Sequence, residues 1–555
     1  MAKRDYSNWT KQGLLKELEK QDKLLGKRYG MIWEDKPEKV AEMCKEKLPI
    51  LSEDKKKKIE IDKKKPVNIL IEGDNYHALS VLNYTHKGKI DVIYIDPPYN
   101  TGAKDWKYNN HYVDINDQWR HSKWLSMMSK RLKLAKGLLK HDGVLICTID
   151  DNEFYHLGCL LEGIFNRWEI HCVTIIHNPR GVQGNNFSYT HEYAYFIFRK
   201  GLKVIGKKLR DKVLKEELRD HGGESLRTDA KNCFYPILVK DNKIVGFGDI
   251  PENRFHPKNK NTKKRNGVIQ VWPIDSKGIE RKWVFAIQTI SEIEDKLFVK
   301  EKKNGEIDIF RIKDTQKPRT VWVDKKYDAS TFGSKIVNKL TGNSFPFPKS
   351  VFNTKDCLGC VIEERKNAVV LDYFAGSGTT AHALLLLNKK DKGNRRFILC
   401  TNNENNIAEE VCFPRIAKVI EGHRDYPDIT KIPANLKYFK TGFVDAKPTD
   451  RNKKQLVDKS TEMLCLKENC FNNVTRGHNF VIFANGQEKY VGIIYDDDGI
   501  KLFKREAKKL NKKFIVYVFS LDESAREEEF EDMAGLVELK PIPAVILNVY
   551  KKIFK

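Results

Sequence analysis

Short, continuous apolar runs alternate with helical stretches along much of the chain, and this alternation most constrains its fold. One run, Ile90–Ile95, ends in Asp96-Pro97-Pro98-Tyr99, and another, Gly143–Ile149, ends in two aspartates. A helical stretch, Trp124–Leu139, lies between them. Apolar runs without polar alternation are typical of strands buried on both faces of a parallel sheet. The sequence therefore predicts an α/β fold with a doubly wound, mostly parallel, Rossmann-like sheet.

The rhythm of apolar runs also divides the chain. It stops after Tyr193–Phe198 and returns at Ala368–Leu371, which indicates one α/β domain interrupted by an inserted module. The module holds 30 basic and 20 acidic residues and short strand-like pieces such as Trp283–Ile287. Near the end of the chain, an Asn485-Gly486 turn between apolar runs predicts a hairpin. We expect five segments: a helical, basic N-terminal arm (1–65), the first half of the core (66–200), the basic module (201–330), the second half of the core (331–445) and a small α/β C-terminal domain (446–555).

The charge of the chain favours a polyanionic partner. The chain has 101 Lys and Arg residues against 76 Asp and Glu, a net charge of +25 in 555 residues. A chain this basic favours nucleic acid as a partner, although a Lys-rich proteome would give the same excess. The run from Lys55 to Lys65 is typical of a solvated linker or of an arm lying on phosphates.

Targeting and cysteine patterns point to the cytoplasm. No run of 18 apolar residues exists and no signal peptide is visible after Met1, so we expect neither a membrane span nor export. Eleven scattered cysteines are typical of reduced thiols in the cytosol. Among them, Cys357 and Cys360 are spaced as CxxC, which we attribute to ordinary packing. We see no constellation of metal ligands and expect no metal site.

The turn Asp96-Pro97-Pro98-Tyr99 combines three features that suit one ligand. The Asp96 carboxylate and the Pro97 carbonyl can each accept one N–H of an exocyclic amino group, and the Tyr99 ring can stack on a planar base. The two prolines fix the backbone between these groups. The alternative is a strand followed by a stiff loop.

A second turn, Gly376-Ser377-Gly378-Thr379-Thr380, follows the apolar run that ends at Asp372. Its glycines let a ligand approach the backbone at the start of a helix. The lysine of a phosphate-binding loop and the dinucleotide spacing are both absent, which disfavours ATP hydrolysis and NAD. The carboxylate of Asp372 and the ring of Phe374 suit a ligand that is cationic and partly apolar.

Together the two turns resemble those of amino-methylating DNA methyltransferases that use S-adenosylmethionine. The base motif (96–99) precedes the cofactor motif (372–380), and this permuted order is similar to the beta class. The length, the N-terminal region and the distinct tail look most like the modification (Mod) subunits of type III restriction systems. Stand-alone and type II enzymes share every motif, and cytosine-N4, RNA and protein-glutamine methyltransferases or a silent DNA-binding subunit remain alternatives.

The resemblance implies methyl transfer to N6 of an adenine flipped out of double-stranded DNA. Adenine is favoured because Asp at the first motif position is typical of the adenine enzymes. Residues 201–330 become a target-recognition domain, and Thr190–Tyr193 resembles a segment near the target base, or is simply a strand start with a buried histidine. The implied partners are DNA, a second copy in a homodimer and a separate restriction subunit, in a bacterial or archaeal cytoplasm. The implied residues are Asp96, Pro97, Pro98 and Tyr99 for catalysis; Asp74, Lys349, Ser350, Asp372, Phe374, Gly376, Gly378, Thr379 and Glu404 for the cofactor; and Arg254, Lys258, Lys260, Lys263, Lys264 and Arg265 for DNA.

Overall fold

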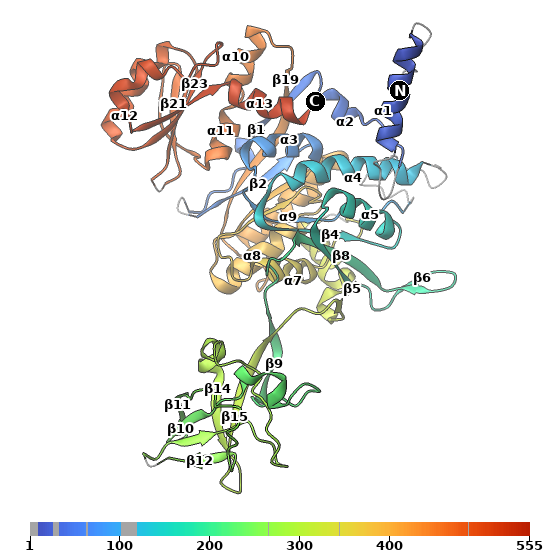
Figure 1. Ribbon diagram of the computed structural model, residues 1–555. Helices are drawn as coiled ribbons and strands as arrows, with labels where there is room; N and C mark the ends of the chain where they lie inside the picture. Colours follow the sequence, from blue (N-terminus) through green and yellow to red (C-terminus); the bar gives the residue numbers. More distant parts are fainter. Residues whose placement is uncertain are drawn as a thin grey trace. The chain divides into compact units, whose positions relative to one another are not determined.

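A computed structural model describes residues 9–25, 33–62, 65–101, 119–264, 266–342, 345–486 and 488–554. The chain forms two compact units (Figure 1). One is Lys207–Pro318, and the other combines Met1–Gly206 with Arg319–Lys555. The inserted module predicted at 201–330 thus corresponds to a unit whose ends lie at 207 and 318.

The larger unit is built on a ten-stranded sheet, in which six of the nine neighbouring pairs are parallel. The predicted mostly parallel α/β sheet is therefore confirmed. The predicted strand Tyr193–Phe198 is present as β8, but it runs antiparallel to both of its neighbours. In spatial order the strands are β1 (Lys47–Glu53), β19 (Asn435–Asp445), β2 (Val67–Glu72), β18 (Arg396–Thr401), β17 (Val369–Asp372), β3 (Ile90–Ile95), β4 (Leu139–Ile149), β8 (His191–Arg199), β5 (Trp168–Ile176) and β16 (Val321–Trp322).

Helices cover both faces of this sheet (Figure 1). Successive residues of a strand point to opposite faces. Ile93 and Leu145 accordingly pack in one apolar cluster, and Val92 and Val144 pack in a second, each together with helices on its own face of the sheet. The doubly wound architecture is thus confirmed. The first face carries α3 (Asn75–Thr85), α4 (Arg120–Lys136) and α5 (Phe154–Ile164); the second carries α7 (Val351–Ile362), α8 (Thr379–Asp391) and α9 (Phe413–Glu421).

The two sequence motifs end neighbouring strands. In β17, Val370 pairs in parallel with Val92 of β3, although the whole insert lies between them in the sequence. Carboxyl ends of parallel strands lie at one edge of a sheet, where doubly wound folds bind ligands. The fold therefore brings the Asp96 turn and the Gly376 turn together. A short helix, α6 (Lys335–Thr341), leads the chain back into this half of the sheet.

The prediction of a helical arm through residue 65 is wrong in its second half. Among the described residues of this arm, two α-helices are present, α1 (Lys11–Leu25) and α2 (Lys39–Met43), but β1 follows as an edge strand of the main sheet. The lysine run is not a free linker either. Lys57 lies 2.5 Å from Glu409 and 4.4 Å from the centre of the Tyr438 ring, whereas Lys63 and Lys64 lie outside the described residues. The apolar residues of β1 carry it into the core.

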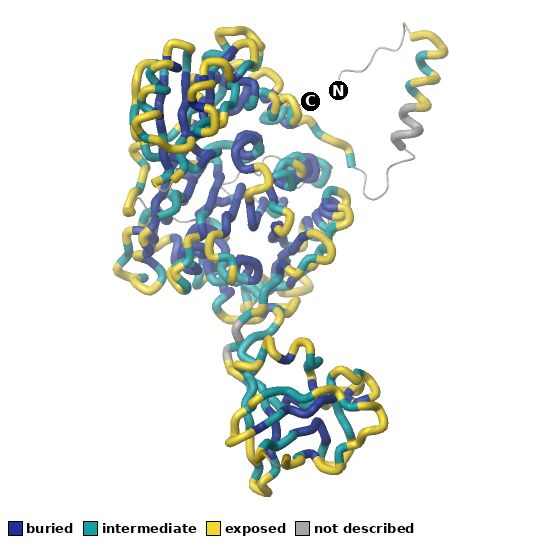
Figure 2. Tube along the Cα trace, turned by 60° about the vertical axis from the view of Figure 1, so that its left-hand side comes forward, coloured by how far each residue is buried: buried dark blue, intermediate teal, exposed yellow. Residues whose placement is uncertain are grey.

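The C-terminal segment folds around a five-stranded sheet, and the predicted hairpin is confirmed as β21 and β22. It shares a buried apolar cluster with the main sheet, and Tyr550 donates a hydrogen bond to the Pro49 carbonyl at 2.5 Å. Figure 2 shows buried strands in both sheets. The elements are α10 (Asp450–Asp458), α11 (Thr461–Glu468), β20 (Asn472–Gly477), β21 (Phe480–Ala484), β22 (Tyr490–Ile494), α12 (Asp498–Leu510), β23 (Phe514–Phe519), β24 (Val537–Ile542) and α13 (Ala544–Ile553).

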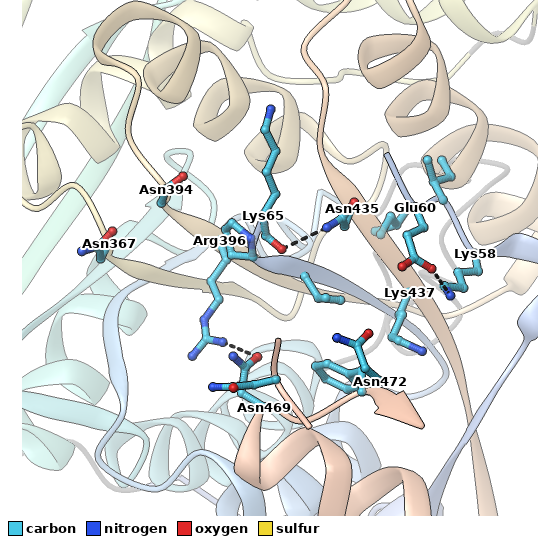
Figure 3. A pocket seen from close by; sticks show the side chains of 16 residues that line it. Lys58, Glu60, Lys65, Asn367, Asn394, Arg396, Asn435, Lys437, Asn469 and Asn472 are labelled. Carbon is cyan, nitrogen blue, oxygen red and sulfur yellow. Dashed lines mark hydrogen bonds and ion pairs between the residues drawn. The ribbon is translucent and has the colours of Figure 1, made fainter. Parts of the chain in front are cut away.

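A polar cavity of about 350 Å³ lies at the amino ends of β2, β18 and β19, opposite the motif edge (Figure 3). Arg396 donates to the Asn469 side chain at 2.7 Å across it, and Asn435 donates to the Lys65 carbonyl at 2.9 Å. These bonds tie the C-terminal segment and the 58–67 loop to the sheet.

The Lys207–Pro318 unit has only antiparallel strand pairs among its described residues. Tyr235, Val271 and Trp283 belong to its own buried core. The predicted strand Trp283–Ile287 is absent; Trp283 makes one isolated bridge with Arg219. The strands are β9 (Lys208–Glu217), β10 (Ile237–Lys240), β11 (Lys243–Phe247), β12 (Asn261–Lys263), β13 (Ile269–Val271), β14 (Leu297–Glu301) and β15 (Ile307–Gln316).

The state of the cysteines and the character of the helices can be compared with the expectations from the sequence. All eleven cysteines are free, and Cys357 and Cys360 are buried in α7. Among the described helices, none is both long and apolar enough to cross a lipid bilayer.

Candidate active site

The Asp96 turn presents hydrogen-bond acceptors at the end of β3. The Asp96 carboxylate accepts hydrogen bonds from the Thr148 hydroxyl at 2.7 Å and the Tyr99 hydroxyl at 2.8 Å. The Pro98 carbonyl accepts from the Trp124 indole at 2.7 Å. Within the described residues no hydrogen bond reaches the Pro97 carbonyl, so this acceptor is available to a ligand.

Lys349, which was predicted to bind the cofactor, lies against the Asp96 turn. Its ammonium group is 3.3 Å from Asp96, forms a close ion pair with Glu192 and lies 4.5 Å from the centre of the Tyr99 ring. Lys349 and Glu192 are both buried. Glu192 also accepts hydrogen bonds from the Tyr99 hydroxyl at 3.3 Å and from the Asn353 amide at 3.0 Å. The Thr190–Tyr193 segment thus reaches the base motif through Glu192.

Burial and nearby groups, chiefly Lys349, shift the pKa values of the turn. Burial raises the pKa of Asp96, and the nearby Lys349 opposes that shift. For Glu192, burial disfavours ionisation, but Lys349 and His177 hold its pKa below the ordinary value. Burial and the Asp96 carboxylate hold the pKa of Tyr99 far above its ordinary value, so its hydroxyl remains a donor. Two carboxylates therefore share one lysine.

A cavity of about 230 Å³ adjoins the turn and reaches the second motif. Pro98 lines it from the first motif, and Asp74, Phe374, Gly376 and Glu404 line it as predicted. The two turns and both flanking acids therefore contribute to one pocket.

Arg131 is a residue of this pocket that sequence reasoning missed. Its guanidinium group lies 2.6 Å from Glu38 and 3.3 Å from Asp74, and all three residues line the cavity. Arg131 is buried on the inner face of α4 between Met128 and Leu132. An arginine on an otherwise apolar helix face was the signal available in the sequence.

Four predicted cofactor residues build the pocket without lining it. Asp372 accepts from the Phe374 amide at 2.9 Å and from the Thr380 hydroxyl at 2.5 Å, so it shapes its own loop. Burial raises the pKa of Asp372 to about 7. The Thr379 hydroxyl accepts from the buried Arg415 at 2.7 Å, and Ser350 caps α7.

Gly378 is the fourth, and its role differs from the one expected. Its φ of 78° lies in the left-handed region, where side chains are strained. A Cβ there would lie 3.2 Å from the Cys412 sulfur and 3.4 Å from Ile416, inside the protein and not in the cavity. The glycine is required by local packing.

A polar network braces the chain just after the base motif. Asn100, with φ of 58°, is buried and donates to the fully buried Glu153 carboxylate. His121 donates to the same carboxylate at 2.7 Å, and His156 lies 3.0 Å from its other oxygen. The ligand atoms of His121, Glu153 and His156 all lie within 4.8 Å of one another. Both hydrogen bonds go to one oxygen of Glu153, and the expectation that no metal is needed stays a prediction.

The basic residues of the insert differ in their availability. Lys260 is buried and ion-paired with Asp308, and Glu306 lies 3.2 Å away. Its predicted role as a free phosphate ligand is therefore wrong. Arg254, Lys258, Lys263 and Lys264 are exposed, and Arg265 lies outside the described residues.

Comparison with known proteins identifies the family. Residues 90–411, more than half of the chain, match the N6/N4 methyltransferase family, described as DNA methylase. The chain belongs to this family. The resemblance drawn from the two turns is thereby confirmed, and this DNA methyltransferase uses S-adenosylmethionine, as its family does.

Several relatives of this DNA methylase are modification enzymes. The type II methyltransferase M.KpnI of Klebsiella pneumoniae is 31% identical, over 68% of this chain and 88% of its own length. The type III EcoPI Mod subunit of Escherichia phage P1 is 30% identical, over 68% of this chain and 63% of its own length. Among solved structures, the M1.HpyAVI–SAM complex aligns over 63% of this chain and 98% of its own, at 12% identity and a TM-score of 0.30. The chain is thus similar to DNA methyltransferases of the restriction–modification type, and adenine specificity is consistent with these relatives.

Proposed function

We propose that this DNA methyltransferase methylates N6 of an adenine flipped out of double-stranded DNA. The observation that carries the proposal is the pairing of two acceptors, Asp96 and the Pro97 carbonyl, beside the cavity lined by Phe374 and Gly376. An amino group held by both acceptors would lie at the mouth of the cofactor pocket. Adenine N6 is part of a base pair in double-stranded DNA, so the adenine must leave the helix first.

Adenine N6 is a poor nucleophile because its lone pair is conjugated with the ring. Asp96 and the Pro97 carbonyl would each accept one hydrogen of the amino group. These two hydrogen bonds would free the lone pair of N6 from conjugation with the ring. Positive charge develops on N6 during attack, so the fixed acceptors stabilise the transition state more than the ground state. Tyr99 would stack on the base and align it for in-line attack.

The pocket suits S-adenosylmethionine, which when bound supplies a methyl group on a positively charged sulfur. Phe374 offers an aromatic face, and Asp74 and Glu404 offer carboxylates to hydroxyl or amino groups. Asp372 holds the Phe374 amide and so keeps the loop in shape. We assign binding to the first three residues and shaping to Asp372, Gly378 and Thr379.

The Lys207–Pro318 unit is our candidate for target recognition, with the exposed cations Arg254, Lys258, Lys263 and Lys264 on phosphates. The similarity to type III Mod subunits supports action with a separate restriction subunit. We further propose a homodimer working in a bacterial or archaeal cytoplasm, where the free cysteines stay reduced.

The test combines product analysis with one variant. Radiolabelled S-adenosylmethionine is offered to DNA, RNA and protein, and labelled DNA is digested to nucleosides. We expect N6-methyladenine from the wild type and a rate at least about 100-fold lower from Asp96→Ala, with DNA binding retained. The matched control is Asp142→Ala, which removes an exposed aspartate within β4. Label in N4-methylcytosine, RNA or protein, or near-normal turnover in Asp96→Ala, would overturn the proposal.

A further inference from the structure

A small hairpin, residues 178–190, extends between β5 and β8 (Figure 1). It consists of β6 (Val182–Gln183) and β7 (Ser188–Tyr189), joined by a four-residue turn. The Asn178 amide donates to the Thr190 carbonyl at 3.1 Å and closes the stem. The hairpin is thus ordered, although residues 182–189 are all exposed.

Its exposed side chains are unusually apolar. Phe187 is 78% exposed, Val182 61% and Tyr189 51%. Three large apolar side chains on one short hairpin are rare on a surface that only meets water, and such clusters mark contact sites. Gly184 lies under the Tyr189 ring, where a Cβ would be 3.0 Å from the ring edge. This close contact holds the ring in place.

The remaining chemistry of the hairpin fits nucleic acid. Residues 178–190 include one cation, Arg180, and no acidic residue, and the three amides between its stem residues, Gln183, Asn185 and Asn186, can bond to base edges or phosphates. An apolar surface for a protein partner would not require this combination. Uncharged, amide-rich and aromatic surfaces suit stacked bases.

The hairpin leads directly into the candidate active site. His191 starts β8, and the next residue, Glu192, contacts the Tyr99 hydroxyl and Lys349. Phe187 precedes Glu192 by five residues, which places it within roughly 16 Å along an extended chain. A duplex whose adenine occupies the Asp96 turn would have its vacated position close to this hairpin.

We propose that the 178–190 hairpin enters the DNA stack and occupies the space left by the flipped base, with Phe187 as the leading side chain and Tyr189 beside it. Apolar wedges between base steps are an established way of opening a duplex. Flipping costs a few kcal/mol of pairing and stacking, and stacking on the rings offsets part of that loss. The inference rests on the proposed adenine methylation, because it needs a flipped target.

The test uses the full-length protein and a duplex that contains its methylation site, mapped by sequencing methylated bases. In one duplex the target adenine is paired; in a second it faces an abasic site and needs little energy to flip. The variant is Phe187→Ala/Tyr189→Ala, and the control is Leu521→Ala, an exposed apolar side chain of the C-terminal segment. A third duplex carries 2-aminopurine at the target, whose fluorescence rises when the base unstacks.

We expect the double variant to lose about tenfold or more in kcat/KM on the paired duplex and to lose most of the fluorescence rise. On the abasic duplex the double variant should have the kcat/KM of the wild type. The control Leu521→Ala should have the kcat/KM of the wild type on both the paired and the abasic duplex. Equal loss on both duplexes would indicate damage to the fold or site and overturn the proposal. Wild-type rates on paired DNA would also overturn it and leave the apolar hairpin to a protein partner. A wild type that methylates no adenine would instead refute the proposed function.

Discussion

Replacing Lys349 by Met tests whether its buried charge sustains the Asp96 turn. The change removes the charge and keeps most of the volume. Lys349 is 3.3 Å from Asp96 and contacts the buried Glu192, and two unit charges at that distance interact by roughly 5 kcal/mol at an effective dielectric constant of 20. Removing one partner of a buried ion pair typically costs about 3–5 kcal/mol. We therefore expect Lys349→Met to lower the free energy of unfolding at pH 8 by about 3 kcal/mol.

The loss should depend on pH with a defined sign. In the wild type the pKa of Glu192 lies below its ordinary value, so its ionisation adds stability above the unfolded-state pKa, and that contribution disappears as pH falls through the folded pKa. Without Lys349, burial dominates and raises the folded pKa. The variant then carries an ionised, unpaired Glu192 at high pH and is relieved as pH falls. The difference in stability should shrink between pH 8 and pH 5.

Denaturant unfolding at pH 8, 6 and 5 measures this difference, and a double variant controls for packing. Lys349→Met/Glu192→Gln restores the balance of charge and should recover most of the lost stability. Catalysis provides a second measurement. Because Lys349 opposes the raised pKa of Asp96, its loss should move the acidic limb of the pH–rate profile to higher pH. A single variant as stable as the wild type at pH 8, or a double variant no more stable than the single, would refute the reasoning.

Three further predictions follow from corrected roles. Gly378→Ala should cost about 1–2 kcal/mol of stability through its positive φ and its contact with Cys412, measured by denaturant unfolding; a stable variant that only lost cofactor affinity would contradict this. For Asp372, the raised pKa near 7 means that stability falls as pH rises from about 4 to 7. Asp372→Asn should remove that dependence of stability on pH, so in thermal melts the variant should compare more favourably with the wild type at pH 8 than at pH 5. An unchanged pH dependence would refute the prediction. The insert has three exposed lysines, Lys258, Lys263 and Lys264. Replacing all three by Ala should lower the slope of DNA affinity against salt by about three units. Replacing the buried Lys260 by Ala as well should lower stability without reducing that slope further.

Features carried by contiguous residues could be predicted from the sequence. Asp96, Pro97 and Tyr99 lie in one turn, and Phe374 and Gly376 in another, so strand ends and turn chemistry were sufficient to select them as candidates. Tertiary contacts were not accessible. Lys349 meets Glu192 across 157 residues, and no local pattern records that meeting.

The errors have the same physical origin. The segment Lys47–Glu53 contains only a short apolar run among lysines, and its partner β19 lies near the other end of the core. Lys260 looks like one more surface lysine until β15 brings Asp308 to it. Gly378 was assigned to a ligand because a glycine in a turn suits both close approach and tight packing, and only the position of Cys412 distinguishes the two.

The charge balance of the Asp96 turn connects these observations to the proposed catalysis. Asp96 and Glu192 carry two negative charges, and Lys349 supplies one positive charge. The turn is therefore left with a net charge of −1 when both acids are ionised. The lysine has two opposing effects: it lowers the pKa of Asp96 against the effect of burial, and it balances only one of the two negative charges. A base whose amino nitrogen becomes positive during attack meets a negative site that existed before the reaction, and no reorganisation is needed at that moment. With a second cation the site would lose this advantage, and with none the pKa of Asp96 would rise further and favour the protonated acid, which is a poorer acceptor.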